Sequence, residues 1–273
     1  MLHAMAAVKN RLMIKATVKL ILLSIWLAIS IALLWLVNKT GKKKWHEGFC
    51  RFSYAIVCMI VGLRVRTEGE MESGRPLLLV SNHISYLDIL VLGAKTPAIF
   101  TPKNDMSRWP VISTICRLLN CIFIERSNEK IKEARVKIQD ALAKGEVVSL
   151  FPEGTTGDGR HLLPFKSSLF SIAEEEIKMP DGDKELLIQP AIISYISVSA
   201  LPIDSTQWPN IAWYGDMVLA PHVWKILQLG KIDAKLTFLP AVTLRQFGGR
   251  KELAAHCYST TVEALQRRHE ANI

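Results

Sequence analysis

The feature that most constrains this chain is an uncharged, apolar run of eighteen residues near its start. The run reads LILLSIWLAISIALLWLV and spans 20–37. As an α-helix it would be about 27 Å long, close to the thickness of a bilayer's hydrocarbon core. A cleavable signal peptide is disfavoured, because the run is long and NKTGKKKW follows where small residues should be. We expect a membrane helix here, with a buried core helix as the alternative.

A second apolar run, 52–63, has the sequence FSYAIVCMIVGL. Twelve residues are too few to cross a bilayer, so this run is expected to form a core or interfacial helix. Basic residues flank the first run on both sides, so the positive-inside rule assigns it no orientation. These residues are Lys15, Lys19, Lys39, Lys42, Lys43 and Lys44.

Positive charge is concentrated at the N-terminal end of the chain. Residues 1–66 contain eleven Lys and Arg and one Glu, a net charge of +10. The whole chain carries +9, so residues 67–273 sum to −1. Nucleic-acid enzymes spread basic residues over the folded surface, so no nucleic-acid partner is expected. The pattern instead predicts a membrane-attachment segment at 1–66, drawn to anionic lipid headgroups, and a folded domain at 67–273.

The cysteines give no sign of a disulfide framework or a zinc site. Five are present, an odd number, and no two are spaced as CxxC. We expect free thiols and no metal. The five are Cys50, Cys58, Cys116, Cys121 and Cys257.

Beyond residue 66, short apolar runs alternate with helical patterns. The runs are continuous in hydrophobicity, as strands buried on both faces should be. Amphipathic helices are predicted at 129–143 and 250–268. Alternating strands and helices indicate an α/β fold with a mostly parallel sheet flanked by helices. The predicted strands are 77–80, 121–125, 147–151, 187–195 and 235–244.

The first predicted strand leads into SNHISYLD, in which His83 and Asp88 are five residues apart. On a regular helix their side chains would point about 140° apart. They can meet if His83 lies in the loop after the strand and Asp88 in the first turn of a helix. A carboxylate on one ring nitrogen would fix the tautomer and leave the other nitrogen as a base. Since no serine is placed as a nucleophile, the pair would activate a substrate hydroxyl.

Two further strands end in groups suited to an anionic ligand. Arg126 follows the run at 121–125, and FPEGTTGDGRH follows the third strand, with glycines that allow close approach of a ligand. Arginine beside a glycine-rich loop favours phosphate binding, and Lys166 in PFKSS adds a second cation. A P-loop is excluded because the GK[ST] ending is missing. Solvated surface charge is the alternative for both cations.

NHxxxxD, FIxR, FPEGT and a proline-containing apolar strand around Pro190 occur in that order. Together these blocks resemble the glycerolipid acyltransferase family, over about residues 65–245. The resemblance implies that His83 is the general base on the acceptor hydroxyl and that Asp88 orients it. It further implies that Arg126 helps to hold the acceptor's polar head.

The family's third motif places Glu153, Gly154 and Thr155 among the substrate-binding residues, and an N-terminal helical element in the membrane. Two positions depart from the family pattern: Asn120 and Ser168 stand where glycine is usual. Both lie where the headgroup of the acceptor would bind.

The resemblance implies acyl transfer from a thioester, acyl-CoA or acyl carrier protein, to a lysolipid hydroxyl, without a cofactor. Arg126 and Lys166 favour 1-acylglycerol-3-phosphate as acceptor. AWYGDM (212–217) and PHVW (221–224) resemble a bacterial branch that includes lyso-ornithine-lipid acyltransferases, although a structural aromatic cluster is the alternative for AWYGDM. A non-catalytic lipid-binding protein is a further alternative. Because thioester donors are cytosolic, the domain is expected on the cytoplasmic face of a bacterial inner membrane.

Overall fold

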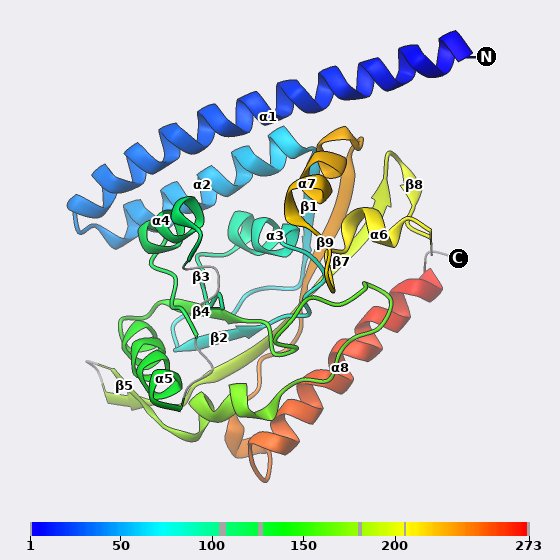
Figure 1. Cartoon of the computed structure of the whole chain (residues 1–273). Helices are drawn as coiled ribbons and strands as arrows, with labels where there is room; N and C mark the ends of the chain where they lie inside the picture. The colour runs from blue at the N-terminus through cyan, green and yellow to red at the C-terminus, as the bar shows by residue number, and fades with distance from the viewer. Residues whose placement is uncertain (1, 104–107, 125–127, 180–181, 205, 272–273) are drawn as a thin grey trace.

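The computed structural model describes residues 2–103, 108–124, 128–179, 182–204 and 206–271. Figure 1 shows two N-terminal helices lying along a twisted sheet with further helices around it. The helices are α1 (Leu2–Lys39), α2 (Lys43–Val61), α3 (Leu87–Lys95), α4 (Pro110–Leu118), α5 (Asn128–Ala143), α6 (Trp208–Ile211), α7 (Leu219–Gln228) and α8 (Arg250–Ala271), with 3-10 turns η2 (Ser167–Glu174) and η3 (Leu244–Gln246).

Seven strands form the main sheet, in the order β1-β9-β7-β2-β4-β3, with β8 paired to β7. Neighbouring strands are parallel except where β7 meets β9 and β8. The strands are β1 (Leu63–Glu68), β2 (Leu77–Val80), β3 (Ile99–Phe100), β4 (Val147–Leu150), β7 (Leu187–Val198), β8 (Leu201–Pro202) and β9 (Ile232–Phe238); β5 (Ile177–Met179) and β6 (Gly182–Lys184) form a separate hairpin. The predicted α/β class and mostly parallel sheet are confirmed.

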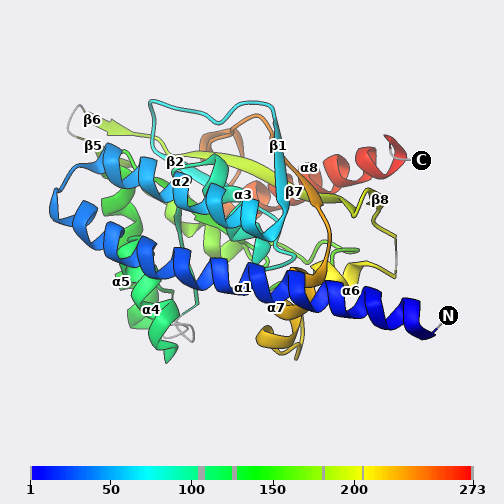
Figure 2. The same cartoon turned by 90° about the horizontal axis from the view of Figure 1, so that it is seen from above.

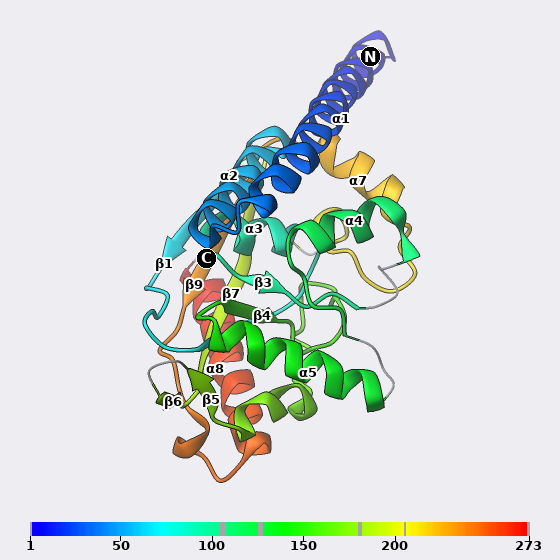
Figure 3. The ribbon, with the colours of Figure 1, turned by 90° about the vertical axis from the view of Figure 1, so that its left-hand side faces the viewer.

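Both faces of the sheet are covered, which explains the continuous hydrophobicity of its central strand. Leu77 and Leu79 of β2 pack into a core shared with α2, α3 and β9. Leu78 and Val80, whose side chains leave the opposite face, pack into a second core with α5, η2 and α8. Figure 3 shows these two sets of helices on either side of the sheet.

Three of the predicted segments differ from the structure. The expected strand at 121–125 is not a strand over its described residues, of which Ile124 alone forms an isolated bridge, to Lys103. The expected strand at 235–244 ends at Phe238, because Pro240 has no N–H for a ladder. The helix expected over 52–63 ends at Val61, where Gly62 takes a left-handed φ of 93° and Leu63 begins β1. The expected domain boundary at 66/67 falls inside β1.

The long apolar run lies within α1, which is long and apolar enough to cross a membrane. Only 11% of its apolar window is buried in the protein. Figure 2 shows α1 running beside α2 and over α7, and α1 contacts both helices. Lys15 Nζ donates to the Leu229 carbonyl at 3.0 Å, and Asn38 Nδ2 donates to the Leu118 carbonyl at 3.0 Å. The helix is therefore held against the domain over most of its length.

Candidate active site

His83 and Asp88 meet at the carboxyl end of β2. His83 lies in the loop after the strand, and Asp88 lies in the first turn of α3. The Nδ1 atom of His83 is 2.8 Å from Oδ2 of Asp88. The His83 side chain keeps 18% exposure, whereas that of Asp88 is fully buried. The loop thus presents one ring edge of His83 to ligands and turns the other toward a carboxylate.

Four groups surround the carboxylate of Asp88. Oδ2 also accepts hydrogen bonds from the backbone N–H groups of Ile84, at 2.6 Å, and Ser85, at 2.8 Å. Oδ1 accepts a hydrogen bond from the Tyr195 hydroxyl at 2.7 Å. Since the backbone groups can only donate, an ionised Asp88 satisfies this set best. The Nδ1 of His83 then carries the proton, and Nε2 is left with a lone pair to act as a base.

Glu153 holds the backbone of the same loop. Its Oε1 accepts the His83 N–H at 2.5 Å and its Oε2 accepts the Leu163 N–H at 2.9 Å. The residue is 3% exposed, and this burial raises the pKa of its carboxyl to about 7 against the two hydrogen bonds, which lower it. The Gly157 N–H donates to the His83 carbonyl at 2.8 Å. The glycine-rich loop and the histidine loop are therefore joined through Glu153 and Gly157.

The imidazole of His83 stacks on the ring of Phe151, with centroids 3.9 Å apart and planes 14° apart. Phe151 immediately follows β4, so two neighbouring parallel strands together position this ring. Beside His83 lies a cavity of about 440 Å³ between the glycine-rich loop, the β7–β8 hairpin and α8. Its lining mixes polar side chains, such as His161 and Gln266, with apolar ones, such as Trp208 and Val262.

The other predicted site residues are distributed around this centre. A Cβ on Gly154, whose φ is 69°, would lie 2.6 Å from Lys166 Nζ, so the lysine packs directly over the glycine. Thr155 and Lys166 are both exposed, and neither lines the cavity beside His83. Arg126 lies outside the described residues.

The sequence analysis did not identify two residues that hold the histidine loop and Asp88 in place. Asn82 exchanges hydrogen bonds with the backbone of Ile193, at 2.8 and 2.9 Å, and so ties the histidine loop to β7. The position of Asn82 directly before His83, in SNH, could have indicated that it belongs to the site. Tyr195 had no such signal, because 107 residues separate it from Asp88.

The AWYGDM and PHVW segments lie against the histidine loop. The N–H of Trp213 donates to the Ile84 carbonyl at 3.0 Å. The Tyr86 hydroxyl lies 3.0 Å from Nδ1 of His222, and the Tyr86 ring meets both Trp213 and His222 edge-on. These contacts form an aromatic cluster that packs against residues 84–86.

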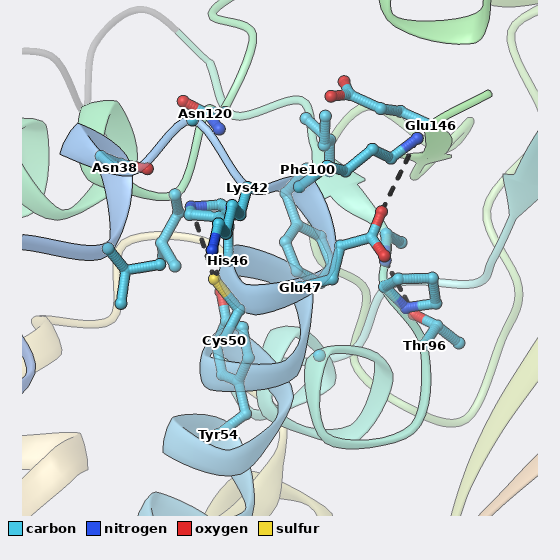
Figure 4. Close-up of a pocket in the computed structure, with 18 residues that line it drawn as sticks. Asn38, Lys42, His46, Glu47, Cys50, Tyr54, Thr96, Phe100, Asn120 and Glu146 are labelled. Carbon is cyan, nitrogen blue, oxygen red and sulfur yellow. Dashed lines mark hydrogen bonds and ion pairs between the residues drawn. The ribbon is translucent and has the colours of Figure 1, made fainter. Parts of the chain in front are cut away.

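A second cavity of about 440 Å³ lies near the turn between α1 and α2 (Figure 4). It is lined by Ile99 at the start of β3 and by Glu146 just before β4, so it lies at the amino-terminal edge of the sheet, opposite His83. Polar groups within it pair with protein: His46 Nε2 lies 2.9 Å from the Leu118 carbonyl, and Lys43 lies 3.7 Å from Glu47. The cavity beside His83 is therefore the candidate active site.

Comparison with known proteins identifies the family of the chain. A family model described as Acyltransferase matches residues 62–194. A lyso-ornithine lipid O-acyltransferase of Rhizobium meliloti is 37% identical over 231 residues, which cover 83% of this chain and 76% of that protein. The chain belongs to the acyltransferase family. The expected resemblance is thus confirmed, and the chain is an acyltransferase rather than a non-catalytic protein.

Other relatives of this acyltransferase are named for a different acyl acceptor. A 1-acyl-sn-glycerol-3-phosphate acyltransferase of Neisseria gonorrhoeae is 30% identical over 212 residues, covering 74% of this chain and 78% of that protein. The crystal structure of the 1-acyl-sn-glycerophosphate acyltransferase PlsC from Thermotoga maritima has a TM-score of 0.69. It is 17% identical and covers 96% of this chain, with 98% of its own length matched. That structure supports the fold.

Proposed function

We propose that this acyltransferase moves a fatty acyl group from a thioester, acyl-CoA or acyl carrier protein, to the hydroxyl of a lysolipid. The observation that carries the proposal is the His83–Asp88 pair at 2.8 Å, which borders a cavity whose lining also includes apolar side chains. A base held in one tautomer activates a hydroxyl, and the cavity offers room for an acyl chain.

The chemistry follows from the protonation states of the pair. Nε2 of His83 takes the proton of the acceptor hydroxyl while the oxygen attacks the thioester carbon. The resulting imidazolium is stabilised by the ionised Asp88. When the tetrahedral intermediate collapses, the carbon–sulfur bond breaks and His83 returns the proton to the leaving thiolate. His83 therefore ends the reaction in the protonation state in which it began, and no cofactor is consumed.

For the acceptor, we propose lyso-ornithine lipid as the first candidate. Its support is the 37% identity to enzymes of that name from Rhizobium meliloti and from Brucella abortus, against 30% for the Neisseria gonorrhoeae relative. This choice reverses the preference drawn from Arg126 and Lys166 alone. Lysophosphatidate is the second candidate, favoured by Lys166, whose ammonium lies over Gly154 of the glycine-rich loop.

The enzyme is proposed to work on a membrane surface, with its domain on the cytoplasmic face, where thioester donors are found. Apolar side chains of α1 are exposed, among them Ile21, at 52%, and Leu36, at 52%. Since α1 contacts α2, α4 and α7, we place it along the membrane surface, buried in one leaflet, with the domain beside it. The acceptor then reaches His83 from the leaflet.

A panel of acceptors tests the function. Purified enzyme is given labelled acyl-CoA or acyl carrier protein together with lyso-ornithine lipid, lysophosphatidate or glycerol 3-phosphate, and labelled product is measured. We expect transfer to lyso-ornithine lipid at the highest kcat/KM. Stronger transfer to lysophosphatidate would favour the second candidate, and no transfer to any of them would refute the proposed function.

A further inference from the structure

The hydroxyl of Tyr195 contacts the carboxylate that orients the histidine. Tyr195 lies on β7, is 5% exposed, and donates to Oδ1 of Asp88 at 2.7 Å. The other three donors to Asp88 all reach Oδ2 and all come from the loop at 83–85. Tyr195 is thus the one partner of Asp88 among these four that comes from outside that loop, on strand β7.

We propose that Tyr195 is a positioning residue of the acyltransferase, which holds Asp88 in place and shares its negative charge so that His83 can both accept and return a proton. The proposal rests on the proposed role of His83 as base. It adds a third member to the pair, supplied by the sheet rather than by the histidine loop.

The hydrogen bond from the Tyr195 hydroxyl restrains the orientation of the Asp88 carboxylate. Rotation of the carboxylate about its Cβ–Cγ bond moves both oxygens, so the Tyr195 donor on Oδ1 adds to the three donors on Oδ2 and restrains both oxygens at once. Asn82 fixes the neighbouring Ile193 of β7 to the same loop through two hydrogen bonds. The strand that carries Tyr195 is therefore in register with the histidine loop, so the hydroxyl is held in place.

The electrostatic setting keeps the phenol a donor. Burial and the neighbouring charge of Asp88 raise the pKa of Tyr195 well above its ordinary value. The phenol therefore stays protonated over the whole range in which an enzyme of this kind works. Titratable groups that face the pair include His83 itself, Glu153 after β4, Cys58 on α2 and Tyr86 before α3.

If Asp88 lost the hydrogen bond from Tyr195, its negative charge would be less well stabilised, and it would hold the imidazolium proton of His83 more tightly. Without Tyr195, protonated His83 would persist to higher pH, and proton return to the thiolate would be slower. The test therefore uses Tyr195→Phe, which removes the hydroxyl and keeps the ring. We expect kcat to fall about tenfold, both KM values to stay within twofold, and the acid-side midpoint of the kcat–pH profile to move about half a unit upward.

Tyr86→Phe is the matched control. It also removes a partly buried phenol hydroxyl with one side-chain partner, but that partner is His222 and not Asp88. We expect its pH midpoint to equal that of the wild type. The titration of Glu153 is common to all three proteins, so the difference between them isolates Tyr195.

A double-mutant cycle with Asp88→Asn shows whether Tyr195 acts through Asp88. In the Asp88→Asn background, we expect Tyr195→Phe to change kcat less than twofold; a further tenfold fall would overturn the proposal. This comparison also serves if Tyr195→Phe alone fails to fold, since the double variant has no buried carboxylate short of a donor. A Tyr195→Phe enzyme with wild-type kcat and pH midpoint would likewise overturn it. Wild-type enzyme that transfers no acyl group to any lysolipid would refute the proposed function instead.

Discussion

The Nδ1 of His83 lies 2.8 Å from Oδ2 of Asp88, although the two residues are five apart in sequence. The contact exists because His83 precedes α3 and Asp88 belongs to its first turn. On a continuous helix the same spacing would separate the side chains. The arrangement leaves Nε2 of His83 available as the proposed base, and we expect activity to be sensitive to substitution at either residue.

His83→Ala should lower kcat by roughly 10²–10⁴, the usual contribution of a positioned general base. Asp88→Asn should also lower kcat, because an amide can donate to Nδ1 and so stabilise the wrong tautomer. Steady-state kinetics with both substrates measure the effect, and KM for the acceptor should change little. His83→Ala protein with near wild-type turnover would contradict the mechanism.

Glu153 should make stability depend on pH. A Glu in the unfolded chain releases its proton near pH 4.5, whereas Glu153 in the native protein does so near pH 7. Between these values the unfolded chain has lost a proton that the native protein keeps, so the free energy of unfolding falls as pH rises from about 4.5 to about 7. Urea denaturation at several pH values measures the slope. Glu153→Gln should remove it, whereas exposed Glu263→Gln should leave it; equal slopes in all three proteins would count against the raised pKa.

The N-terminal segment should anchor the protein by apolar burial. Removal of residues 1–44 deletes the long apolar run and eight Lys and Arg, and much of the protein should then leave the membrane fraction. Full-length protein should resist a high-salt wash, because ions do not screen apolar burial. Release of the intact protein by salt alone would show that the attachment is electrostatic.

The placement of α1 along the membrane surface also has a test. If α1 lies within one leaflet, a reporter fused to the N-terminus stays on the same side of the membrane as the catalytic domain. A crossing helix would put the two on opposite sides. Protease accessibility of N-terminal and C-terminal reporters in sealed vesicles distinguishes these outcomes, and cleavage of the N-terminal reporter from the opposite side would refute the in-plane placement.

The acceptor can be probed at Lys166. If the acceptor is a phosphate monoester, Lys166→Ala should raise its KM about tenfold or more, since charge-assisted contacts are worth about 1.5–3 kcal/mol. The donor KM should stay the same. Glycerol phosphate should also compete at millimolar levels. With lyso-ornithine lipid as acceptor, glycerol phosphate should have little effect, because that headgroup carries a carboxylate and an amine but no phosphate.

The sequence by itself determined the class of fold and pointed to His83 and Asp88 as the proposed reactive pair. The continuous hydrophobicity of β2 and β4 indicated strands covered on both faces, and the runs at 129–143 and 250–268 indicated the helices that cover them. Those signals are local, because side-chain periodicity depends on nearby residues alone. The spacing in SNHISYLD likewise showed how His83 and Asp88 could meet, since both lie within one loop and the following helical turn.

Only the tertiary structure decided what surrounds that pair. Tyr195 reaches Asp88 from 107 residues away, because β7 lies beside β2 in the sheet, and strand order is not written in any local pattern. The family resemblance implied that Glu153 binds substrate, and the structure shows that its two oxygens accept backbone N–H groups of His83 and Leu163. The run at 121–125 has the composition of a strand, but strand formation needs a partner ladder along its length, and its described residues have an isolated bridge instead. Long-range pairing, which the chain acquires by folding, set these contacts.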